Sequence, residues 1–146
     1  MQKENFVREE AFLEKFKKNF LSMENMYAAG CGPCEGVAKE AALKIGETVK
    51  VVSCAYELEE YIHGPNLQLT PNYTVFFIDG GLASDRTQEI FEATGVITDK
   101  TYMLTNKKGL EGKNIINPDF EINELITPLA LSLIHISEPT RRTPIS

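Results

Sequence analysis

Three features that this 146-residue chain lacks limit the classes of function that it can have. It has no tryptophan, no apolar run close to the length of a membrane-spanning helix, and no cluster of basic residues. The net charge is −6, so we expect neither nucleic acid nor an anionic membrane as a partner. The three cysteines form no framework of even pairs, which indicates a reducing, cytoplasmic setting.

The last sixteen residues of the chain, 131–146, are treated separately from the rest of the sequence. Residues 131–146 resemble one translated reading frame of a DNA-sequencing adapter, and we expect them to be non-native and unpacked. Residues 1–22 are expected to form an N-terminal helix that connects to a missing upstream domain. Residues 23–130 are expected to be one domain, truncated at its C-terminus and long enough to bury a core.

Strand and helix patterns alternate along the chain. This alternation predicts an α/β fold, a three-layer α/β/α sandwich with a doubly wound, flavodoxin-like parallel sheet. Residues 73–78 are nearly all apolar and are predicted to be an inner strand, while Ser84 is expected to cap a helix that Gly95 ends. The predicted strands are 25–29, 50–54, 73–78, 101–104 and 114–116; the predicted helices are 4–21, 35–46, 56–62, 84–94 and one from 121 onward. In the helix 35–46, the residues expected to face inward are Val37, Ala38, Ala41, Ala42 and Ile45.

The segment Cys31-Gly32-Pro33-Cys34 is typical of disulfide oxidoreductases. It follows a strand candidate and opens a helix, and Pro71 precedes a strand at about the distance seen in thioredoxins. Against this alternative, no tryptophan precedes the motif, the strand before it is only weakly apolar, and the chain continues with two more strands. We favour the hypothesis that these cysteines are small residues in a tight loop.

A second pattern overlaps the first. It consists of a Gly-x-Gly at residues 30–32, then Ala-x-Glu-x-Ala-Leu-Lys-x-x-Glu at residues 38–47, then His-Gly-Pro at residues 63–65. In this order and spacing, residues 26–130 resemble the second sugar isomerase (SIS) domain of double-domain phosphosugar enzymes. The segment 124–129 is similar to the start of the last helix of such a domain.

The resemblance implies roles for two residues, Glu47 and His63, and the position of Lys44 one helical turn before Glu47 suggests a third. Glu47 corresponds to the family's base, which moves a proton between C1 and C2 of a sugar phosphate through an enediol. His63 corresponds to a histidine that reaches across a homodimer interface and opens the sugar ring. Lys44 would orient Glu47 or touch the substrate. The structural alternatives are a solvated helix-end Glu, a capping His and an exposed Lys.

The resemblance also sets expectations for the whole site. We expect Glu47 to line a cleft at the carboxyl edge of the sheet and His63 to lie on a surface that a second chain can reach. Residues 30–36 contain no Ser or Thr, so the phosphate would be held by another domain, and this chain alone should be inactive. No metal and no cofactor are expected.

The chemistry is left open between isomerase, transaminase, and deglycase or deaminase. A non-catalytic SIS domain that senses a sugar phosphate is a further alternative.

Overall fold

The computed structural model describes residue 14 and residues 22–117. The predicted helix over residues 4–21, the helix from residue 121 and the tail 131–146 therefore lie outside the described residues, apart from residue 14. The expected domain division remains a prediction.

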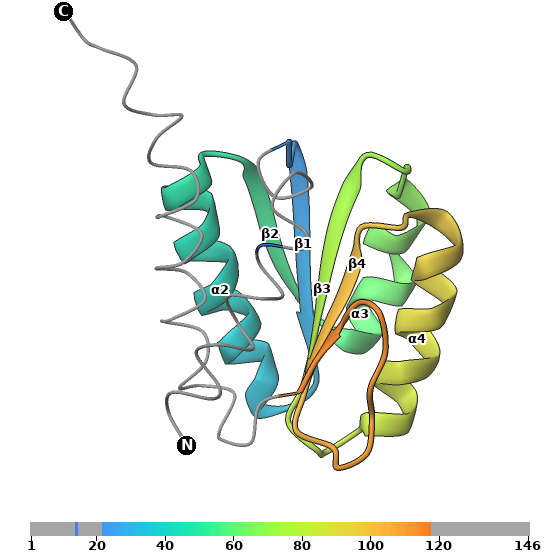
Figure 1. Cartoon of the computed structure of the whole chain (residues 1–146). Coiled ribbons are helices and arrows are strands. Elements are labelled where there is room, and N and C mark those ends of the chain that lie inside the picture. Colours follow the sequence, from blue (N-terminus) through green and yellow to red (C-terminus); the bar gives the residue numbers. More distant parts are fainter. Residues whose placement is uncertain (1–13, 15–21, 118–146) are drawn as a thin grey trace, which may run out of the picture.

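The described chain forms one sheet of five parallel strands in the order β2-β1-β3-β4-β5. Helix α2 packs on one face and helices α3 and α4 on the other, giving three layers (Figure 1). This confirms the predicted doubly wound fold. The elements are β1 (Asn25–Gly30), α2 (Pro33–Val49), β2 (Val52–Glu57), α3 (Leu58–His63), the 3-10 turn η1 (Pro65–Gln68), β3 (Tyr73–Asp79), α4 (Ser84–Ile97), β4 (Thr101–Thr105) and β5 (Ile115–Ile116).

Strand β3 lies at the centre of the sheet, as its apolar sequence predicts. It pairs with β1 on one side and β4 on the other, and every residue from Thr74 to Asp79 is buried. A strand covered on both faces must be apolar throughout, which explains why β3 shows no alternation of polar and apolar residues.

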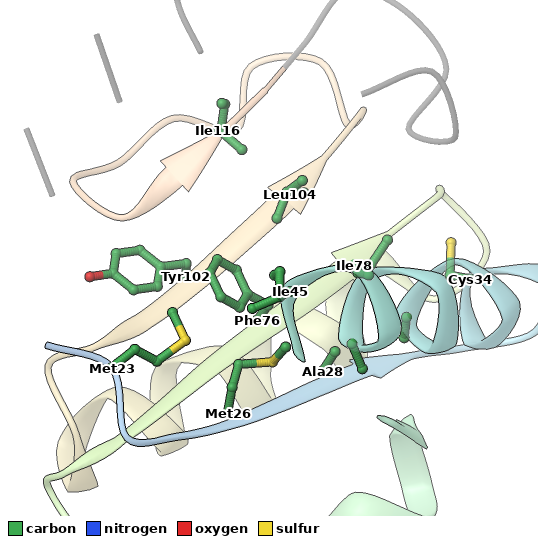
Figure 2. Close-up of a cluster of buried hydrophobic side chains, with 13 residues drawn as sticks. Met23, Met26, Ala28, Cys34, Ile45, Phe76, Ile78, Tyr102, Leu104 and Ile116 are labelled. Atoms are coloured by element: carbon green, nitrogen blue, oxygen red, sulfur yellow. The ribbon is translucent and has the colours of Figure 1, made fainter. Parts of the chain in front are cut away.

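Helix α2 packs unusually closely on the sheet. It presents small side chains, Ala38, Ala41 and Ala42, together with Ile45, to a core that Figure 2 shows around Met26 and Phe76. Where the helix begins, a Cβ on Gly30 would overlap the backbone carbonyl of Cys34, so only glycine fits there. The inward-facing residues of α2 are those that the sequence predicts.

The other face is built from aromatic residues. Tyr61 of α3 and Phe77 of β3 meet edge to face with their ring centroids 5.4 Å apart, and Phe91 of α4 lies 6.3 Å from Phe77. Tyr61 and Phe77 are fully buried, so α3 and α4 cover the middle of this face.

Several predicted boundaries are wrong; residues 56 and 57, for example, end β2 and do not begin α3. Strand β2 begins at Val52 rather than at residue 50, because α2 continues to Val49 and Lys50 caps it in the left-handed conformation (φ 59°). Ser84 does not cap α4: Ala83 occupies the cap position, and the helix continues through Gly95 to Ile97.

Candidate functional site on α2 and β2

An open concavity lies between the C-terminal half of α2 and the edge strand β2. Its volume is about 420 Å³, within the range of small-molecule sites. Its floor is apolar, and two charged side chains of opposite sign stand at its rim, Lys39 and Glu47. The lining residues are Lys39, Ala42, Leu43, Gly46 and Glu47 of α2, with Ser53 and Ala55 of β2.

The helix and the strand are held together at this point by small residues. The hydroxyl of Ser53 donates a hydrogen bond of 2.7 Å to the carbonyl oxygen of Ala42. A Cβ on Gly46 would overlap this hydroxyl, so the glycine allows the close approach. The site therefore rests on a rigid helix and a strand rather than on loops.

Glu47 lines this concavity, but the concavity does not lie where we expected it. In a parallel β-α-β unit the helix runs back from the carboxyl ends of the strands, and Glu47 is in the last turn of α2. It therefore lies toward the amino edge of the sheet, and the expected placement at the carboxyl edge is wrong. The side chain of Glu47 is exposed in the chain.

Lys44 does not line the concavity. Its ammonium group lies 3.8 Å from the carboxylate of Glu40, one turn away on the exposed side of α2. The lysine that does line it is Lys39, which also pairs with Glu35 at 3.2 Å. Sequence reasoning missed Lys39, although positions 39, 43 and 47 share one helix face by their spacing of four.

His63 ends α3 and is exposed, as a residue that meets a second chain has to be. It does not lie near Glu47 in one chain, because α3 and α2 pack on opposite faces of the sheet (Figure 1). The two predicted residues can meet only between chains.

The carboxyl edge of the sheet holds a different cluster, centred on Asp79 at the end of β3. This carboxylate is 2% exposed and accepts three hydrogen bonds: 2.9 Å from the Gly81 amide, 2.9 Å from the Ser84 hydroxyl and 2.7 Å from the Thr105 hydroxyl. These bonds fasten the β3–α4 loop to β4, so we assign Asp79 a structural role. In the sequence, this cluster could have been found from Asp79, the charged residue that ends the apolar run of β3.

The cysteine motif at this edge does not sit in a thioredoxin-like fold. All five described strands are parallel, whereas a thioredoxin sheet is mixed. The disulfide oxidoreductase alternative therefore has no support.

Within residues 22–117, no group of three or more His, Cys, Asp or Glu side chains is arranged to hold a metal ion. In the same part of the chain, none of the helices combines the length and the apolar character needed to cross a membrane.

Comparisons with known proteins agree with the fold. No protein-family model and no curated protein sequence matches the chain. Among solved structures, a candidate phosphosugar isomerase from Clostridium difficile 630 matches with a TM-score of 0.82 at 22% identity, over 97% of this chain and 41% of that one. The C-terminal domain of glucosamine-fructose-6-phosphate aminotransferase from Francisella tularensis gives a TM-score of 0.73 at 16% identity, over 92% and 42%.

A third match is glucosamine-6-phosphate deaminase from Thermotoga maritima, with a TM-score of 0.67 at 21% identity over 90% of this chain and 41% of that one. The chain therefore has the fold of a sugar isomerase (SIS) domain. It spans less than half the length of these three proteins.

Proposed function

We propose that this chain is the second SIS domain of a double-domain phosphosugar enzyme. In this proposal Glu47 is the base that carries a proton between C1 and C2 of a ketose phosphate. His63, supplied by a partner subunit, exchanges protons with the ring oxygen. The observation that carries the proposal is the placement of Glu47 at the rim of the concavity between α2 and β2.

The concavity fits a phosphosugar in size and in charge. A volume of about 420 Å³ accommodates a six-carbon sugar phosphate. Lys39, on the same helix face as Glu47, supplies a positive charge for an anionic ligand. Residues 30–36 offer no Ser or Thr hydroxyl, so the main phosphate contacts come from another domain in this proposal.

A second surface is needed to complete the site. A carboxylate base works best when it is partly removed from water, and Glu47 is exposed in this chain. The chain covers only 41% of the candidate isomerase that it matches, so such proteins have further chain to close the concavity. We expect the 146-residue chain alone to show no turnover.

The opposite positions of Glu47 and His63 support a site shared between subunits. An exposed histidine at the end of α3 is free to enter a neighbour's site, while it is out of reach of Glu47 in its own chain. An imidazole can both donate and accept a proton, which suits ring opening. The proposal therefore requires at least a homodimer.

The test compares two carboxylates of the same helix in a complete protein that carries this domain. Glu47→Gln should slow exchange of the C2 proton with solvent by roughly two to four orders of magnitude, the usual reach of general acid–base catalysis. Glu40→Gln is the matched control, because Glu40 is exposed and pairs with Lys44 outside the concavity. His63→Ala should slow turnover of closed-ring sugar more than turnover of open-chain sugar.

Exchange of the C2 proton at the wild-type rate in Glu47→Gln would refute the catalytic assignment. If the sugar phosphate still bound in that case, the domain would be a sensor rather than an enzyme.

A further inference from the structure

The Cys-x-x-Cys segment between β1 and α2 is the one motif that the proposed function leaves unused. The Cys34 amide donates a hydrogen bond of 3.1 Å to the carbonyl oxygen of Cys31, which closes a turn. Gly32, with φ 59° and ψ −126°, has the conformation of the first central residue of a type II′ turn, and Pro33 suits the second.

This turn brings the two cysteines within reach of each other. The first and last Cα atoms of a β-turn lie within about 7 Å, and disulfides usually join Cα atoms about 5.5 Å apart. Both thiols are free. The geometry is therefore that of a dithiol that can close without unfolding α2.

The two thiols differ in exposure. Cys31 is partly exposed, whereas Cys34 is 8% exposed and packs in the core of the α2 face (Figure 2). Gly80, the residue after β3, lies against the Cys34 sulfur. A Cβ on Gly80 would lie 2.6 Å from that sulfur, so the loop rests directly on it.

We propose that Cys31 and Cys34 form a reversible dithiol–disulfide pair that a small-molecule disulfide oxidises. The oxidation would loosen the contact between α2 and the β3–α4 loop, at the point where the strand order of the sheet reverses.

The reaction proceeds in two exchanges. Cys31 loses its proton and attacks one sulfur of the small disulfide, whose S–S bond breaks; one half stays bonded to Cys31 and the other leaves as a thiolate that takes up a proton. Cys34 then loses its proton and attacks the Cys31 sulfur, which releases the second half as a thiolate. Two protein thiols are oxidised, and one small disulfide is reduced to two thiols.

The consequence for the loop follows from the position of Cys34. In the disulfide its sulfur is held toward Cys31, so its contact with Gly80 weakens. The same loop contains Asp79 and Ser84, which anchor α4 to β4. Oxidation should therefore change the structure at the carboxyl edge of the sheet and leave the surroundings of Glu47 unchanged.

The experiment uses the 146-residue chain in buffers with a rising ratio of oxidised to reduced glutathione, followed by acid quenching, alkylation and peptide mass mapping. Cys31 and Cys34 should lose alkylation together, in a peptide lighter by two hydrogens, and dithiothreitol should restore both. Cys54 should remain alkylated, and Cys54→Ser should give the same curve. Hydrogen exchange at the Gly81 amide, which donates to Asp79 in the same loop, should be roughly fivefold faster in the oxidised chain.

Three results would overturn the proposal. One is a mixed disulfide in which glutathione remains on Cys31 and Cys34 stays a free thiol that can be alkylated. Another is a disulfide that includes Cys54. The third is oxidation that occurs only in denaturant.

Discussion

The two faces of the sheet are packed in different ways. On the α3–α4 face, large rings interlock and are fully buried, as with Tyr61 and Phe77. On the α2 face, the helix lies close to the sheet on alanines and glycines and leaves an open concavity beside β2. Both faces bury a core, but only the α2 face leaves a concavity, and at that concavity it exposes a carboxylate on a rigid support.

The largest expected effect is a loss of stability, tested with one apolar residue of the buried core and one at the rim of the concavity. Phe77→Ala should lower the free energy of unfolding by about 3–5 kcal/mol, because it opens a cavity among buried rings. Leu43→Ala should change it by less than about 0.5 kcal/mol, because Leu43 is 54% exposed at the rim of the concavity. Urea unfolding of both variants measures the difference. Similar losses in the two would show that the division between the faces is wrong.

An intermediate effect appears at alkaline pH. Burial raises the pKa of Tyr61 to about 12, with an opposing contribution from its 2.9 Å hydrogen bond with Thr94. In the unfolded chain tyrosine ionises near pH 10, so between about pH 10 and 12 only the unfolded state releases this proton. The free energy of unfolding should therefore fall as the pH rises through this window, by roughly 2 kcal/mol from Tyr61.

Tyr61→Phe is the control for this pH effect, because phenylalanine does not titrate. Its unfolding free energy should fall less steeply with pH than that of the wild type. Identical slopes would show that Tyr61 is not the source.

The smallest expected effect is a difference in stability between alanine substitutions at two glycines of α2. Gly36 has open space around it, so Gly36→Ala should stabilise the protein by about 0.5–1 kcal/mol through helix propensity. Gly46→Ala should destabilise it by about 1 kcal/mol, because the new methyl group displaces the Ser53 hydroxyl from its bond to Ala42.

The double variant Gly46→Ala/Ser53→Ala tests the reason given for Gly46. It should recover most of the stability lost in Gly46→Ala, as measured by thermal unfolding. Equal stabilisation by Gly36→Ala and Gly46→Ala would contradict a close seam between α2 and β2.

Much of the fold could be predicted because β3 and α2 carry strong patterns. The apolar run of β3 marked an inner strand, and the spacing of Ala38, Ala41 and Ile45 marked the buried side of α2. The start of β2 could not be predicted, because Lys50 ends α2 in a left-handed conformation that its sequence does not indicate.

The site was predicted less completely than the fold. The motif identified Glu47 as a candidate, but its position in space depends on the direction in which α2 runs from the carboxyl edge. Lys44 was predicted because it lies one turn before Glu47, whereas in the structure it pairs with Glu40 and Lys39 lines the concavity.

The measurement that tests the central claim most directly is carbodiimide labelling of Glu47, with Glu40 as the internal reference. In the 146-residue chain both carboxylates should react, because both are exposed. In a complete protein carrying the domain, labelling of Glu47 should fall several-fold and fall further with a bound ketose phosphate, while labelling of Glu40 stays the same. If Glu47 remains as reactive as Glu40 when the complete protein is saturated with sugar phosphate, the concavity between α2 and β2 is not the site.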